Sequence, residues 1–304
     1  MNTNDFKTRT EIIEEQSTCP EGYWVLGLDT GYSSVKGKSP NKRFAFPYYA
    51  KKVPEGRAFL REAEDSDIRY RDETGEWVVG KLAYDEVNAK EIVDSEQELT
   101  GRHRFFTDIF RVTTRTGIAL GLMPNKYGSC EDKHIMIEAG LPPKYINDAV
   151  DLREALCGKH DFEVKVGAGN WIKYSIELKE NDIQVMPQPL GSLVSASTNA
   201  NGRQLKTAIQ YWSGNVIVFD PGYGTLDTYI VKRGQVIGKG ETFPEYGMHE
   251  VFARTCRDIE KEFGLSIEVP ELQNCLESGE VKVIVSRRPL KTRKYSFKDL
   301  SLIH

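Results

Sequence analysis

The chain contains the stretch VIVFDPGYGTLD, from Val216 to Asp227, and the interpretation of the whole sequence starts from it. Four apolar residues, Val216–Phe219, are typical of a buried strand and lead directly into an Asp-Pro-Gly turn. Residues Thr228–Lys232 then predict a returning strand. Glycines allow backbone N–H groups to approach an anion closely and permit positive φ, so this turn is suited to bind phosphate.

A second copy of this arrangement lies about 190 residues earlier. The apolar run Tyr23–Leu28 predicts a strand, the segment Asp29-Thr-Gly-Tyr-Ser-Ser-Val-Lys36 follows as a turn, and Val35–Gly37 begins a second strand. A single Asp-x-Gly turn is weak evidence because the pattern is common in turns. Two copies in this order predict a duplicated α/β unit with a break near residues 190–214.

Each turn combines hydrogen-bond donors with one carboxylate, a set that suits a phosphate chain and its metal ion. Asp29 and Asp220 are expected to hold hydrated Mg²⁺ through water, and Lys36 is expected to neutralise phosphate charge. The other residues expected to contact the nucleotide are Gly31, Ser33, Ser34, Gly222, Tyr223, Gly224, Thr225 and Asp227.

These motifs resemble those of the actin, Hsp70 and sugar-kinase ATPase superfamily. Residues 27–37 and 216–231 resemble its first and second phosphate motifs, and Glu138–Pro142 resembles its Gly-Leu-Pro segment. Residues 183–193, IQVMPQPLGSL, are similar to the strand and helix start that carry the catalytic carboxamide or carboxylate. Within the superfamily, the chain looks most like the plasmid-segregation bacterial actins of the ParM/StbA type.

The resemblance implies an α/β fold of two actin-like, ribonuclease H-like domains around an interdomain nucleotide cleft. The expected parts are a polar tail (1–22), a first domain (23–189), an interdomain helix or linker (190–214) and a second domain (215–304). No adenosine motif follows the strand at 281–285, so the second domain is expected to be incomplete. By the same match, Gln188 orients the attacking water, with Asp29 and Asp220 as the other catalytic residues.

The resemblance also implies a function. We expect an ATPase that binds Mg·ATP, polymerises head to tail and hydrolyses ATP for plasmid or DNA-element segregation. A DNA-binding adaptor protein would capture the filament, so direct nucleic-acid contact is not required. Two alternatives stay open: a non-catalytic nucleotide-binding scaffold or adaptor, and a small-molecule kinase of the same superfamily.

Composition excludes several other classes. The chain has 304 residues, a formal net charge of −4 and no apolar stretch near the ~20 residues of a membrane helix. Five scattered cysteines without a Cys-x-x-Cys pair argue against a disulfide scaffold or zinc site and favour the cytoplasm. A basic cluster is expected to be a solvated loop face, with a DNA or filament contact as the alternative: Arg287, Arg288, Lys291, Arg293 and Lys294.

The remaining pattern predicts regular elements only in part of the chain. Residues 40–80 are charged and are expected to be loop-rich, with one strand at Glu76–Val79. Further strands are expected at 134–139, 162–166, 171–178, 183–186 and 235–238, and helices near 101–122, 145–156, 190–200 and 246–263.

Overall fold

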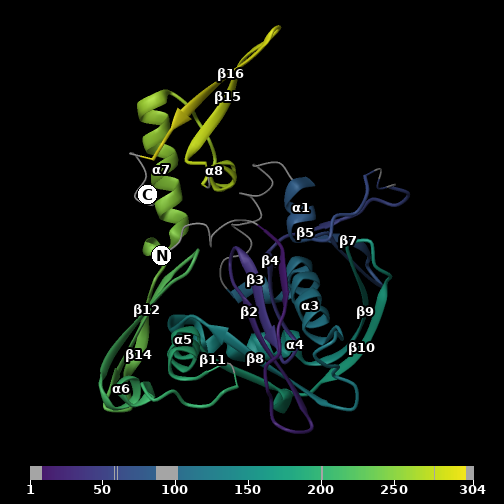
Figure 1. Ribbon diagram of the computed structural model, residues 1–304, viewed down its shortest axis with the longest axis vertical. Helices are drawn as coiled ribbons and strands as arrows, with labels where there is room; N and C mark the ends of the chain where they lie inside the picture. Colours follow the sequence, from purple (N-terminus) through teal and green to yellow (C-terminus); the bar gives the residue numbers. More distant parts are fainter. Residues whose placement is uncertain are drawn as a thin grey trace.

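Sheets and helices alternate along the chain in a computed structural model that describes residues 9–57, 59, 61–86, 102–199, 201–276 and 278–298. Figure 1 shows two β-rich bodies with helix α5 between them, and helix α7 leading from the smaller body towards an outlying hairpin. The fold is of the mixed α/β class that the sequence predicts.

The largest sheet has six strands, and the first Asp-x-Gly turn lies at one end of its central pair. Strand β2 pairs antiparallel with β3 and parallel with β8, which in turn pairs parallel with β11. The spatial order is β1 (Glu11–Glu14), β4 (Lys42–Pro47), β3 (Ser34–Ser39), β2 (Tyr23–Thr30), β8 (His134–Leu141) and β11 (Ile183–Pro187).

Strand β1 corrects one expectation, because the segment 1–22 was expected to be only a polar tail. Residues 11–14 pair antiparallel with β4, with Ile12 opposite Phe44. Ile12 also packs against the main hydrophobic core, so burial of this side chain favours the strand although Glu11 and Glu14 at its two ends are charged.

Helix α3 (Asp108–Leu122) lies closely against the large sheet. Thr107 caps its first turn, with the hydroxyl accepting a hydrogen bond from the amide of Phe110. A Cβ atom at Gly121 would lie 2.5 Å from Cδ1 of Leu26, and one at Gly117 would lie 2.8 Å from Cδ1 of Leu28. These two glycines, one helical turn apart, therefore allow the close contact that holds β2 in place.

A second, five-stranded antiparallel sheet shows that the expectation for residues 40–80 is wrong. Three of its strands lie in this range, where β4 of the large sheet is a fourth, instead of the single strand expected. Charged side chains in this sheet pair across strands, as Arg69 does with Glu76 and Arg71 with Glu163. The order is β10 (Ile172–Leu178), β9 (Gly158–Val166), β6 (Ile68–Asp72), β7 (Gly75–Val79) and β5 (Ala50–Lys52).

The second Asp-x-Gly turn lies in a three-stranded antiparallel sheet, β12 (Asn215–Pro221), β13 (Leu226–Lys232) and β14 (Gln235–Phe243). Its strand order repeats that of β2, β3 and β4, which agrees with the predicted duplication. Helices α5 (Gln188–Ser197) and α6 (Ala208–Ser213) pack against it, with Leu193 of α5 and Trp212 of α6 in one hydrophobic cluster with Tyr229 and Val231 of β13.

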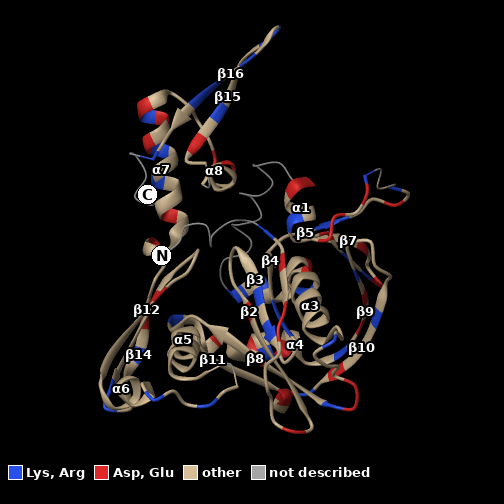
Figure 2. Ribbon diagram, in the orientation of Figure 1, with Lys and Arg blue, Asp and Glu red and all other residues tan. Residues whose placement is uncertain are grey.

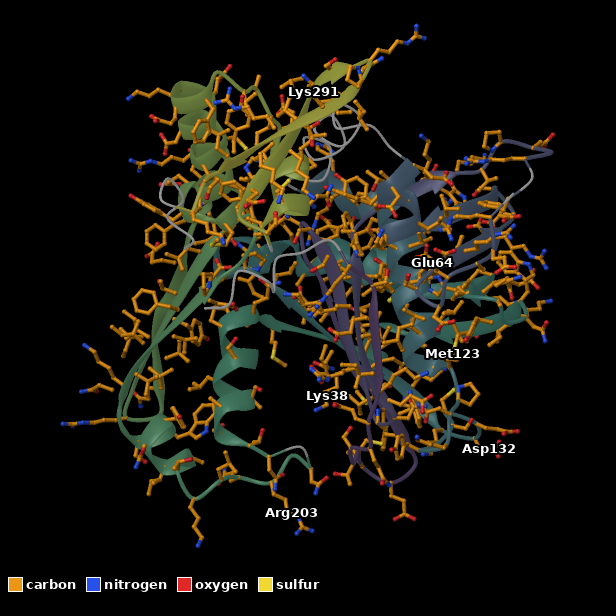
Figure 3. All side chains as sticks on the ribbon, turned by 45° about the horizontal axis from the view of Figure 1, so that its top comes forward. Lys38, Glu64, Met123, Asp132, Arg203 and Lys291 are labelled. Carbon is orange, nitrogen blue, oxygen red and sulfur yellow. The ribbon has the colours of Figure 1, made fainter. Side chains whose placement is uncertain are left out.

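The chain continues with α7 (Met248–Phe263), α8 (Val269–Cys275) and a hairpin of β15 (Glu280–Arg287) and β16 (Leu290–Ser296). The basic cluster that was expected in a loop lies on this hairpin, where the ribbon is blue at Lys and Arg positions in Figure 2, and its Lys291 is labelled in Figure 3. The two strands of the hairpin pair with each other, which explains why this segment is not a loop. Most of its side chains are exposed, as expected for a solvated face.

Shorter helices complete the described elements. They are α1 (Lys81–Glu86), α4 (Ala149–Leu156) and the 3₁₀ turns η2 (Arg102–Phe106), η3 (Pro143–Asp148), η4 (Glu180–Asp182) and η5 (Pro244–Tyr246). In the parts of the chain that the structure describes, no helix is long and apolar enough to cross a bilayer.

Candidate functional site

The two Asp-x-Gly turns have matching geometry. Asp29 lies opposite Lys36 in the first hairpin, and Asp220 lies opposite Asp227 in the second. In both, a Cβ atom on the glycine two residues after the aspartate would crowd the carbonyl oxygen three residues further on, at 3.1 Å for Gly31 and 3.2 Å for Gly222. The sequence repeat is therefore also a structural repeat.

The reason for the glycines differs from the expectation. Positive φ was expected to be one use of glycine in these turns, but Gly31, Gly222 and Gly224 all have φ outside the positive range. Close contact explains them instead: a Cβ atom on Gly224 would lie 2.6 Å from Cδ2 of Tyr32, and one on Gly247 would lie 2.5 Å from the carbonyl carbon of Gly224. Gly224 therefore lies so close to the ring of Tyr32, and Gly247 so close to the backbone of Gly224, that neither position has room for a side chain.

The N-terminus of α7 fixes the second turn. The amide of Met248 donates to the carbonyl oxygen of Gly222 at 3.0 Å, and the amide of His249 donates to that of Tyr223 at 2.8 Å. Within the turn itself, the amide of Gly222 donates to the carbonyl oxygen of Thr225 at 2.8 Å. These bonds hold the turn and the helix as one unit.

Both turns face one cavity of about 770 Å³. This volume is in the range of small-molecule and nucleotide sites. Lys38 of β3 also contributes to the wall, and Figure 3 shows it on the side of the sheet that faces α5. Every site residue expected from the sequence lines this cavity: Asp29, Gly31, Ser33, Ser34, Lys36, Gln188, Asp220, Gly222, Tyr223, Gly224, Thr225 and Asp227.

Helix α5 connects the carboxylates of the two turns. Gln188, its first residue, donates from Nε2 to Oδ1 of Asp29 at 3.0 Å. One helical turn later, the Ser192 hydroxyl donates to Oδ2 of Asp220 at 3.5 Å. Gly140 makes room for this arrangement, because a Cβ atom there would lie 2.8 Å from Cγ of Gln188. One helix therefore holds side chains against both aspartates.

Burial sets the charge balance of the cavity. It raises the pKa of Asp29, and the nearby Lys36 and Arg104 partly offset this rise, while Asp220 adds to it. Burial also raises the pKa of Asp220, and Lys36 again lowers it. Lys36 thus lies within electrostatic reach of both carboxylates, and these carboxylates are close enough to disfavour each other's ionisation.

This arrangement fits a divalent cation held through water. Asp29 and Asp220 repel each other in one cavity, and a cation between them would relieve that repulsion. Among the described residues, no three His, Cys, Asp or Glu side chains are grouped to hold a metal directly. Water and phosphate oxygens would therefore have to complete the coordination shell.

Thr225 and Asp227 form a buried pair behind the second turn. The Thr225 hydroxyl donates to Oδ2 of Asp227 at 3.0 Å, and Thr242 forms a further hydrogen bond that lowers the pKa of this carboxyl. Burial raises the same pKa more strongly. Only 2% of Asp227 is exposed and its hydrogen bonds are with Thr225 and Thr242, so its predicted contact with a nucleotide stays a prediction.

Several residues that line the cavity were not predicted from the sequence as site residues. Tyr32, Arg104, Glu138 and Ser192 all line the wall, and burial raises the pKa of the Glu138 carboxyl. Glu138 lies within the Gly-Leu-Pro segment, and Ser192 follows Gln188 by one helical turn, so both had a local signal. Arg104 comes from a distant segment that nothing in the sequence connects to the turns.

Comparison with solved structures supports an actin-like fold. A ParM protein described as a pCBH ParM non-polymerisable quadruple mutant superposes with a TM-score of 0.65 and 20% identity, covering 91% of this chain and 78% of that one. A 15-stranded ParM filament from Clostridium botulinum gives 0.63 and 17%, with the same coverage. The actin-like protein Alp7A gives 0.59 and 16%, covering 91% of this chain and 74% of that one.

Sequence comparison gives the family. No curated protein matches this chain. The family model described as the N-terminal domain of actin-like proteins matches residues 27–191, a range that contains the first turn, the Gly-Leu-Pro segment and Gln188. Because this match spans more than half of the 304 residues, the chain belongs to the family of actin-like proteins.

Proposed function

We propose that this chain is an ATPase that binds Mg·ATP between its two Asp-x-Gly turns and polymerises into filaments that segregate a plasmid or another DNA element. The observation that supports it best is the placement of α5. Its Gln188 contacts Asp29 of one turn and its Ser192 contacts Asp220 of the other, within one cavity. A phosphate chain bound there would meet donors and carboxylates from both turns.

Each residue has a defined part in this proposal. Backbone and hydroxyl groups of the two turns bind the phosphate chain, and Lys36 neutralises part of its charge. Asp29 and Asp220 hold water molecules of a Mg²⁺ ion, which would supply charge neutralisation on the phosphate oxygens. Gln188 orients a water molecule in line with the terminal phosphate, a task that needs hydrogen bonding and not a strong base.

The proposal includes two domains, residues 23–189 and 215–304, joined by 190–214. Separate hydrophobic clusters support this division: the largest runs from Trp24 to Ile183, and another joins Tyr223 and Phe252 to Phe297. For self-association, the support is that a ParM chain of the same fold forms a filament. The proposed second partner is a DNA-bound adaptor protein that captures the filament.

The first test is Mg²⁺-dependent binding of a fluorescent ATP analogue to wild-type protein and to Asp220→Ala. A matched control is Asp161→Ala, since Asp161 is exposed on β9 and outside the cavity. We expect Asp220→Ala to lower the affinity in Mg²⁺ tenfold or more, and Asp161→Ala to leave it unchanged. Wild-type protein that binds no nucleotide in Mg²⁺ would refute the proposal.

Phosphate release and ATP-dependent pelleting then separate the remaining possibilities. Release together with pelleting supports the filament-forming ATPase. Binding without release would instead favour a nucleotide-binding scaffold, and transfer of labelled phosphate to a small acceptor would favour a kinase.

A further inference from the structure

Arg104, in the 3₁₀ turn η2, is a buried cation in the wall of the cavity. Only 3% of the residue is exposed, and its Nη1 atom has no hydrogen-bond partner in the described part of the chain. No carboxylate among the described residues forms an ion pair with it. A buried guanidinium with an unbonded N–H group is unfavourable, so an additional hydrogen-bond acceptor beside Nη1 would stabilise it.

Aromatic rings, and not an acid, determine where this guanidinium lies. Its central carbon is 4.9 Å from the centroid of the Tyr32 ring and 5.0 Å from that of Phe105. Tyr32 follows Gly31 in the first turn, and the same ring lies against Gly224 of the second turn. Stacking therefore holds Arg104 where the two turns meet and leaves hydrogen-bond donors unused.

The position of Arg104 relative to Asp29 indicates which part of a ligand it would contact. Arg104 lowers the pKa of Asp29, so the two side chains are within electrostatic reach. Asp29 in turn accepts a hydrogen bond from Gln188, the residue proposed to orient the attacking water. Arg104 also lines the cavity and stacks on Tyr32, which belongs to the same turn as Asp29, so its unpartnered Nη1 lies beside that turn.

We propose that Arg104 binds the terminal phosphate of a nucleoside triphosphate in this cavity, which makes the site selective for triphosphate over diphosphate. The inference rests on the proposed function, because it assumes that the cavity takes a nucleotide. Guanidinium N–H groups match phosphate oxygens in geometry, and bonds between charged partners are stronger than neutral ones. The terminal phosphate would supply the hydrogen-bond acceptor that Nη1 of the buried side chain lacks.

The test is calorimetric titration of the whole chain with Mg²⁺ and either a non-hydrolysable ATP analogue or ADP. Arg104→Met removes the charge at similar length, and Arg257→Met is the control, since Arg257 lies on α7 outside the cavity in an exposed pair with Glu250. We expect Arg104→Met to weaken the triphosphate tenfold or more and ADP less than threefold. Arg257→Met should change neither.

Thermal unfolding without nucleotide gives a second readout that does not depend on binding. Arg104→Met should melt at the wild-type temperature or above it, because the substitution removes a buried charge whose Nη1 has no hydrogen-bond partner among the described residues. A large fall in melting temperature would mean that Arg104 holds the fold together, and would overturn the inference. Equal binding of the triphosphate by wild type and Arg104→Met would overturn it while leaving the proposed function intact. Failure of wild type to bind either nucleotide would overturn both.

Discussion

Substitution of Gly224 by alanine tests how closely the two turns meet. The added Cβ atom would lie 2.6 Å from Cδ2 of Tyr32, 3.1 Å from its Cγ and 3.2 Å from its Cε2. All three contacts are with the rigid ring of Tyr32, so a movement of the far end of this side chain alone cannot relieve them. Either the ring or the second turn must move, and the Arg104 guanidinium stacks on the same ring.

The expected cost follows from this overpacking. Insertion of a methyl group into a closely packed site costs about 1–3 kcal/mol. Since the entropy of unfolding is about 2.1 cal/mol/K per residue, this corresponds to a fall in melting temperature of about 2–5 °C for a chain of this length. Nucleotide affinity should fall as well, because Tyr32 follows Gly31 directly in the first turn.

Gly191→Ala is the matched control for this substitution. Gly191 lines the same cavity from α5, but its Cβ atom would meet only the sulfur of Met186, at 4.0 Å. Alanine in a helix is favoured over glycine by about 1 kcal/mol, so this variant should melt slightly above wild type. Circular dichroism melts of the three proteins give the comparison. If Gly224→Ala melts at or above the wild-type temperature, the close contact deduced here is wrong.

Three further predictions concern the cavity. Gln188→Ala should lower phosphate release tenfold or more and change ATP binding less than threefold, as measured by a phosphate-release assay beside a titration; equal losses in both would contradict a water-orienting role. Asp220→Asn should raise the melting temperature of nucleotide-free protein at pH 7, because burial raises the pKa of this carboxyl above 3.8 and its ionised form is therefore disfavoured in the folded protein. The difference should shrink as the pH falls through the raised native pKa and vanish below 3.8, and a constant difference from pH 3 to 8 would exclude this cause. Thr225→Val should destabilise the protein by about 1–3 kcal/mol in urea unfolding, because Asp227 loses a donor, whereas Thr225→Ser keeps the hydroxyl and should remain near wild type; similar losses in both variants would assign the effect to packing.

The elements that could be predicted from the sequence are those whose apolar residues are contiguous or follow the helical period. Strand β2, strand β12 and helix α7 are of this kind, and each lies close to its expected position. Strands β5 and β6 were harder to predict, because lysines outnumber the apolar residue in AKK and charged residues alternate with buried ones in IRYRD, whereas the contiguous apolar residues of β7 predicted a strand. Their stability depends on pairing with distant strands, which local pattern does not reveal.

The residues of the candidate site differ in the same way: some belong to a local motif, and others depend on contacts between distant segments. Asp29 and Asp220 could be predicted because the chemistry of each is carried by a local motif that occurs twice. Arg104 could not be predicted, because it belongs to the site only through its buried contact with Tyr32. The two residues are 72 positions apart, and no local sequence pattern indicates such a contact. Gly140 could be predicted in part. Its Gly-Leu-Pro motif is visible in the sequence, but only the structure shows that this glycine makes room for Gln188.

The bonds between the second turn and α7 have a mechanical consequence. Amides of Met248 and His249 bind the turn directly, so the turn and the helix must rotate together. The helix has 16 residues and is therefore about 24 Å long. A tilt of about 5° at the turn would carry the far end of such a lever about 2 Å sideways. The hairpin β15–β16, which packs near that end through Tyr295 on Phe263, would move with it, so that a small rotation at the second turn becomes a larger displacement at the outer surface.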